Sequence, residues 1–196
     1  MKFRFLMLLV AALLFVGPSA NAETIEFFVT GAAGDGLLPG NIDPPTGSSG
    51  SGGIGMAGIM FDTQTNTLSL DLEWGSENGY SDLTGEVTLL HLHGPTPSLP
   101  PFNFGEINTQ ILVNLGNSLN FDSSGTGGGI EDVFFLSNKQ EEYLLSGRTY
   151  INVHTAANPT GEIRGYLLPV GFSVPEPGSA AIIVVFGLAI LRQRRR

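Results

Sequence analysis

Short segments in which apolar and polar residues alternate occupy the middle of this chain, and stretches rich in glycine and proline separate them. In residues 67–74, Leu68, Leu70 and Leu72 would lie on one side of a strand and the residues between them on the other. Glycine occurs 27 times, and charged residues make up only 14% of the chain, which is too few for many solvent-exposed helices. This pattern predicts a mostly antiparallel β structure.

The positions of the turn residues predict where the strands and loops lie. One short helix is expected to begin at Ser137, which forms a capping box with Gln140, and to end near Gly147. Residues 31–53, rich in glycine, proline and serine, are expected to form a long loop. The expected strands cover residues 24–30, 55–62, 67–74, 87–93, 150–155 and 161–168, with weaker candidates at 111–115 and 132–136.

The first 22 residues have the three parts of a secretion signal. Lys2 and Arg4 give a positive start, residues 6–16 are apolar, and Ala20-Asn21-Ala22 has the small-residue pattern of a cleavage site. The alternative is an uncleaved anchor, but eleven apolar residues fall short of the roughly 20 that a membrane-spanning helix needs. We therefore expect export, with signal peptidase cutting after Ala22.

Residues 170–196 contain, in order, Pro175-Glu176-Pro177, an apolar stretch over residues 180–191, and a cluster of four arginines that should stay cytoplasmic. This tail resembles the PEP-CTERM sorting signal of Gram-negative bacteria. The resemblance implies processing by an exosortase, a transient inner-membrane anchor, and delivery to the cell surface or extracellular matrix. A permanent anchor is the alternative, although twelve apolar residues are few for one span.

The basic residues gather at the two ends of the chain, so the part between them is strongly acidic. From Glu23 to Glu176 there are 18 carboxylates and only three basic residues, a net charge of −15. Such a surface repels phosphate backbones, so nucleic-acid binding by the folded part is excluded as a function. The chain has no cysteine, which excludes disulfides and thiolate metal sites.

Two segments carry a family resemblance: His91-Leu92-His93-Gly94-Pro95, and residues 150–165, which read YINVHTAANPTGEIRG. In this order and spacing they make residues 23–169 resemble the CHRD domain, which is named after chordin and also occurs in exported bacterial proteins. The resemblance implies an all-β sandwich, immunoglobulin-like or superoxide-dismutase-like, with one short helix. The N-terminal signal and a C-terminal apolar helix would lie outside the domain. The resemblance to the CHRD domain implies a binding context and no established reaction.

The chain has three histidines, and two of them lie two residues apart. His91 and His93 would therefore share one face of a strand, and with His154 from a neighbouring strand they could hold zinc or copper. The fourth ligand would be water or a carboxylate, for which Glu162 is the nearest candidate in the sequence. The set distantly resembles Cu/Zn superoxide dismutase, but three histidines are too few for its two-metal site. The alternative is that the imidazoles form hydrogen bonds with protein groups and fasten the strands together. Glu162 and Arg164, also two residues apart, predict a surface ion pair.

Three hypotheses follow from these patterns. The first is a non-catalytic, exported binding module that associates with the cell surface or with exopolysaccharide, with no firm cofactor. The second is a histidine-based zinc or copper protein, which with copper could be redox-active. The third is a structural protein of the matrix. In each case the partners during export would be signal peptidase and an exosortase.

Overall fold

The computed structural model describes residues 23–97 and 108–171, which form ten strands and one α-helix. Three single turns of 3-10 helix lie between them, η1 (Pro39–Asn41), η2 (Ser76–Asn78) and η3 (Leu115–Asn117). The α-helix is α1 (Asn138–Leu145). The strands are β1 (Thr24–Gly31), β2 (Gly34–Asp35), β3 (Gly52–Asp62), β4 (Thr67–Trp74), β5 (Val87–His93), β6 (Ile111–Asn114), β7 (Phe121–Asp122), β8 (Gly129–Phe135), β9 (Thr149–Thr155) and β10 (Ile163–Pro169).

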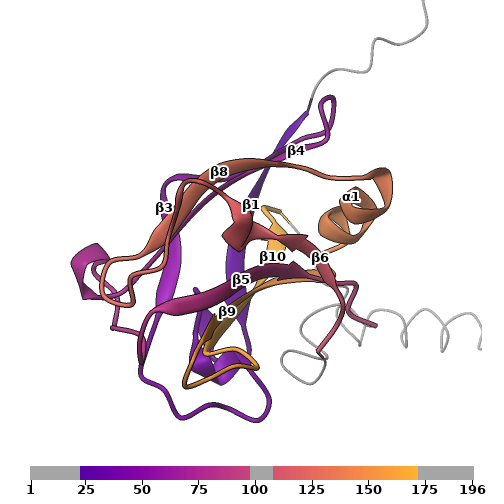
Figure 1. Ribbon diagram of the computed structural model, residues 1–196. Helices are drawn as coiled ribbons and strands as arrows, with labels where there is room; N and C mark the ends of the chain where they lie inside the picture. Colours follow the sequence, from indigo (N-terminus) through magenta and orange to yellow (C-terminus); the bar gives the residue numbers. More distant parts are fainter. Residues whose placement is uncertain (1–22, 98–107, 172–196) are drawn as a thin grey trace, which may run out of the picture.

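All strand pairs are antiparallel, and they form one continuous sheet that curls into two facing layers (Figure 1). The order is β6-β5-β9-β10-β1-β3-β4-β8-β7, with β2 added to β1. Strand β1 joins the two layers, because residues 27–30 pair with β10 whereas residues 24–26 pair with β3. The predicted fold class, mostly antiparallel β with a single helix, is confirmed for the described residues.

The hydrophobic core lies between the two layers. Leu68, Leu70 and Leu72 of β4 are buried on one side, as their alternation predicts. The opposite layer contributes alternate residues of β5 and β9 to the same core cluster: Leu90, Leu92, Ile151 and Val153. Each such side chain contributes roughly 1.5–3 kcal/mol when fully buried. Because these apolar residues point inward, the residues between them in β5 and β9 point to the other face of the sheet.

Helix α1 begins as the sequence predicts. The Ser137 hydroxyl accepts a hydrogen bond from the Gln140 backbone N–H, and the Gln140 side-chain oxygen accepts one from the Ser137 N–H. The Gln140 amide also donates to the Leu112 carbonyl of β6 at 2.6 Å, and Leu144 is fully buried in the core. The helix is therefore attached both to β6 and to the core.

Residues 31–53 were expected to form one loop, and the structure is more ordered than that. They contain β2 and η1, and β3 already begins at Gly52. The buried Asn41 side chain organises this stretch: it accepts a hydrogen bond from the Ala33 N–H at 2.8 Å and donates to the Arg164 carbonyl at 2.9 Å. A single asparagine thus supplies hydrogen bonds that strand pairing supplies elsewhere. Two-residue strands such as β2 and β7 are too short to show an alternating pattern.

The two expected addresses lie outside the described residues. The signal that ends at Ala22, the triplet Pro175-Glu176-Pro177 and the apolar tail after it are therefore not described structurally. Within residues 23–97 and 108–171, no helix has the length and apolar character that crossing a membrane requires.

Candidate metal centre

The three histidines come together on the side of the sheet that faces away from the core. His91 and His93 lie on β5, and His154 lies on the adjacent strand β9. In the register of these strands, Tyr150 is directly opposite His93 and Asn152 is directly opposite His91. His154 lies two residues beyond Asn152 on the same face. The predicted common face of His91 and His93, and the contribution of a neighbouring strand, therefore agree with the register.

The three rings form a compact and buried cluster. The centroid of the His91 ring is 5.4 Å from that of His93 and 5.1 Å from that of His154, and the remaining pair is 6.2 Å apart. Each side chain is less than 10% exposed. One nitrogen of each ring lies within 4.8 Å of the other two, and in the described part of the chain this is the one such group of His, Cys, Asp and Glu. A tetrahedral ion bonded at about 2 Å would need these nitrogens about 3.3 Å apart, so the rings would have to move closer together to bind it.

Hydrogen bonds to backbone carbonyls set the tautomers of two rings. His93 Nδ1 lies 2.8 Å from the Thr109 carbonyl oxygen, and His154 Nδ1 lies 3.0 Å from that of Pro159. A carbonyl oxygen can only accept, so each Nδ1 donates a proton and the neutral ring carries its lone pair on Nε2. Both Nε2 atoms, and Nδ1 of His91, are buried and have no hydrogen-bond partner. Three ring nitrogens are thus left for a ligand.

The surroundings keep these rings neutral. Burial lowers the pKa of all three imidazoles, and that of His93 falls to about 4. The positive charge of Arg164 further lowers the pKa of His93 and of His154, while their backbone hydrogen bonds act in the opposite direction. Neutral imidazole is the form that binds a metal ion. An imidazole N–H donated to a backbone carbonyl is also the usual way in which metal-binding histidines are oriented.

Glu162, the predicted fourth ligand, is engaged elsewhere, and the prediction is wrong for this structure. The carboxylate is fully buried, and it accepts hydrogen bonds from the Ser48 hydroxyl, from the Thr84 N–H and hydroxyl, and from the Thr155 hydroxyl at 2.6–2.8 Å. Burial raises the pKa of this carboxyl, but these hydrogen bonds outweigh burial and leave its pKa below the usual value. Glu162 therefore remains a carboxylate that fastens loops to the sheet.

The predicted surface ion pair between Glu162 and Arg164 is also wrong. Both side chains are fully buried, because loops cover this part of the sheet. The Arg164 guanidinium lies over the Tyr150 ring, 4.3 Å from its centroid, and donates to the Asn108 side-chain oxygen at 2.7 Å. Sequence reasoning did not single out Tyr150. Tyr150 is four residues from His154 on β9, so the alternation of the strand places both side chains on the same face of the sheet. The alternation does not reveal that loops bury this outer face.

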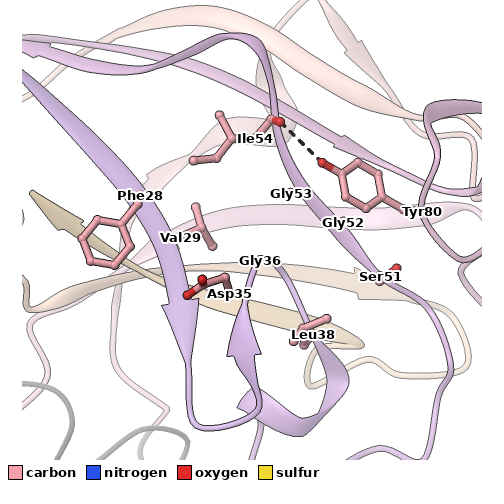
Figure 2. A pocket seen from close by; sticks show the side chains of 10 residues that line it. All are labelled: Phe28, Val29, Asp35, Gly36, Leu38, Ser51, Gly52, Gly53, Ile54 and Tyr80. Carbon is pink, nitrogen blue, oxygen red and sulfur yellow. Dashed lines mark hydrogen bonds between the residues drawn. The ribbon is translucent and has the colours of Figure 1, made fainter. Parts of the chain in front are cut away.

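A separate cleft opens where β1 and β3 diverge, and Figure 2 shows the side chains around it. Its volume is about 420 Å³, and Asp35 is the one charged side chain in its lining. At its edge the Tyr80 hydroxyl donates to the Ile54 carbonyl at 3.4 Å. The lining is otherwise mostly apolar: Phe28, Val29, Gly36, Leu38, Ser51, Gly52, Gly53 and Ile54. The cleft holds no histidine and no group of acid, base and nucleophile, so the histidine cluster is the stronger candidate site.

Comparison with known proteins agrees with the family resemblance in the sequence. The family model of the CHRD domain matches residues 36–167, which is more than half of the chain and includes all three histidines. Neither the curated proteins nor the solved structures gave a match. On the strength of the family match, the chain belongs to the CHRD domain family.

Proposed function

We propose that this protein is an exported binding module whose CHRD domain holds one zinc or copper ion at His91, His93 and His154. Two observations carry the proposal. Each histidine has one buried ring nitrogen without a hydrogen-bond partner, and each of the three rings offers a nitrogen within 4.8 Å of the other two. A buried polar atom without a partner costs about 1–3 kcal/mol. A cation bound between the three rings would remove that cost at all three atoms.

The alternative role, hydrogen bonding that fastens the strands, accounts for only part of the cluster. It explains Nδ1 of His93 and of His154, which donate to the Thr109 and Pro159 carbonyls. It does not explain why the Nε2 atoms of the same two rings, and Nδ1 of His91, are buried without a hydrogen-bond partner. A ligand set of three neutral imidazoles suits zinc and copper.

The cellular setting is also part of the proposal, and the sequence of the two ends supports it. We propose that the signal is removed after Ala22 and that the tail with Pro175-Glu176-Pro177 is processed by an exosortase, in a Gram-negative bacterium. The inner membrane would then hold the protein transiently, before it reaches the cell surface or an exopolysaccharide matrix. In this setting we assign binding rather than catalysis to the domain. Copper in place of zinc would add redox activity as the alternative.

Thermal unfolding of the full chain in mild detergent, with zinc and with chelator, tests the metal proposal. Zinc at 100 times its Kd should add about 2.7 kcal/mol of stability, because the ion binds only the folded state. For a chain of this size that corresponds to a rise in Tm of roughly 5–10 °C. His154→Ala should abolish this rise, and a parallel titration with copper identifies the preferred ion.

Thr155→Val is the matched control. Thr155 is the next residue along β9, is fully buried, and loses a hydrogen bond to Glu162 when the hydroxyl is removed. This variant should have a lower Tm but keep the full metal-dependent rise. The metal proposal fails if the wild-type chain shows no rise with either ion, or if both variants keep the rise.

A further inference from the structure

Tyr150 packs against His93 of the histidine cluster. It is directly opposite His93 in the pairing of β9 with β5. The two rings are stacked, with centroids 5.0 Å apart and planes only 2° from parallel. The Tyr150 side chain is completely buried, and the Arg164 guanidinium lies 4.3 Å from its ring centroid. Burial and the Arg164 guanidinium therefore fix the plane of the Tyr150 ring. Because the His93 ring is stacked on it, the Tyr150 ring restricts the plane of His93.

Tyr150 and His93 also form hydrogen bonds with the two backbone groups of Thr109. The Tyr150 hydroxyl accepts a hydrogen bond from the Thr109 N–H at 3.0 Å. The Thr109 carbonyl accepts one from His93 Nδ1 at 2.8 Å. Because this carbonyl sets the tautomer of His93, the hydroxyl that holds Thr109 in place influences which ring nitrogen keeps the lone pair.

We propose that Tyr150 is a positioning residue of the histidine cluster, which fixes the plane and the tautomer of His93 so that its Nε2 lone pair faces the other two rings. The effect on His93 follows from the contacts of Tyr150 alone. The consequence for metal affinity rests on the proposed function. Removing one such supporting contact around a metal ligand typically lowers affinity 10–100-fold.

The test compares Tyr150→Phe with Tyr166→Phe in the full chain. Tyr166 is the cross-strand neighbour of Tyr150 on β10, is 1% exposed, and lies one strand further from the histidines. Both variants lose a buried tyrosine hydroxyl, and both keep an aromatic ring stacked on His93. Only Tyr150→Phe loses the hydrogen bond to Thr109. Tyr150→Leu removes the stacked ring as well.

Two measurements are made on each variant. Nitrogen-15 NMR of the metal-free chain reports the tautomer of His93, and competition with a chelator of known affinity gives the zinc Kd. We expect one Nδ1–H tautomer of His93 in the wild type and in Tyr166→Phe, and a mixture in Tyr150→Phe. The zinc Kd should rise about tenfold in Tyr150→Phe, further in Tyr150→Leu, and less than about threefold in Tyr166→Phe.

The two readouts separate this inference from the proposed function. If the wild type binds neither zinc nor copper, the metal proposal fails, but the NMR comparison still decides whether Tyr150 sets the tautomer of His93. If zinc binds and Tyr150→Phe matches Tyr166→Phe in both tautomer and Kd, the positioning role is wrong and the metal site stands.

Discussion

At the scale of single residues, the hydrogen-bond partners of a buried polar side chain distinguish a structural role from a binding role. Both oxygens of Glu162 are occupied, each by two donors from Ser48, Thr84 or Thr155. Each histidine of the cluster instead keeps one buried nitrogen without a partner. The carboxylate therefore contributes to stability, whereas the imidazoles are free to bind a ligand.

Glu162→Ala should destabilise the domain by about 3 kcal/mol, because it leaves buried hydroxyl and N–H donors without their charged acceptor. Urea unfolding measures this loss. Glu131→Ala, which removes an exposed carboxylate from β8, should change stability by less than about 0.5 kcal/mol. Equal losses in the two variants would contradict the structural role of Glu162.

The same residue predicts a dependence of stability on pH. The pKa of Glu162 is lowered in the folded domain from its usual value of 4.5, so the unfolded chain takes up a proton first as the pH falls. Its contribution is therefore complete above pH 4.5 and decreases as the pH falls through the folded pKa. Glu162→Gln should reduce the loss of stability between pH 5 and pH 3, measured by thermal unfolding. A wild-type slope in this variant would show that other carboxylates cause it.

At the scale of elements, alternation and capping signals allowed most of the secondary structure to be predicted. The bounds of β4 and β5 and the capping box of α1 agree with the structure, because each depends on residues within one segment. The partners that decide the role of the histidines could not be predicted in this way. Thr109 and Pro159 contact the rings through backbone carbonyls, which leave no mark in a side-chain pattern. The burial of Glu162 and Arg164 likewise depends on loops far away in the sequence.

At the scale of the whole molecule, an acidic β domain lies between two ends that we propose to be targeting signals. The folded part carries the histidine cluster, and the two ends carry six of the nine lysines and arginines. A metal ion acquired at the cluster would be acquired outside the cytoplasm if the proposed export is correct. The metal site and the sorting tail are independent claims, and either can fail without the other.

Replacement of Pro175, Glu176 and Pro177 with alanines should make the protein accumulate in the inner membrane, because the apolar segment and the arginines would remain attached. Fractionation and mass spectrometry of the mature protein measure this. In the wild type we expect an N-terminus at Glu23 and no peptides from residues 180–191 in the surface fraction. Recovery of those peptides from the fully matured protein would contradict processing of the tail.

X-ray absorption at the zinc edge, on the chain loaded with one equivalent of zinc, tests the central claim most directly. The account predicts three imidazole nitrogens at about 2.0–2.1 Å from the ion, and the loss of at least one of them in His93→Ala. A zinc ion surrounded only by oxygen ligands, or one whose spectrum His93→Ala leaves unchanged, would contradict a metal centre built from His91, His93 and His154.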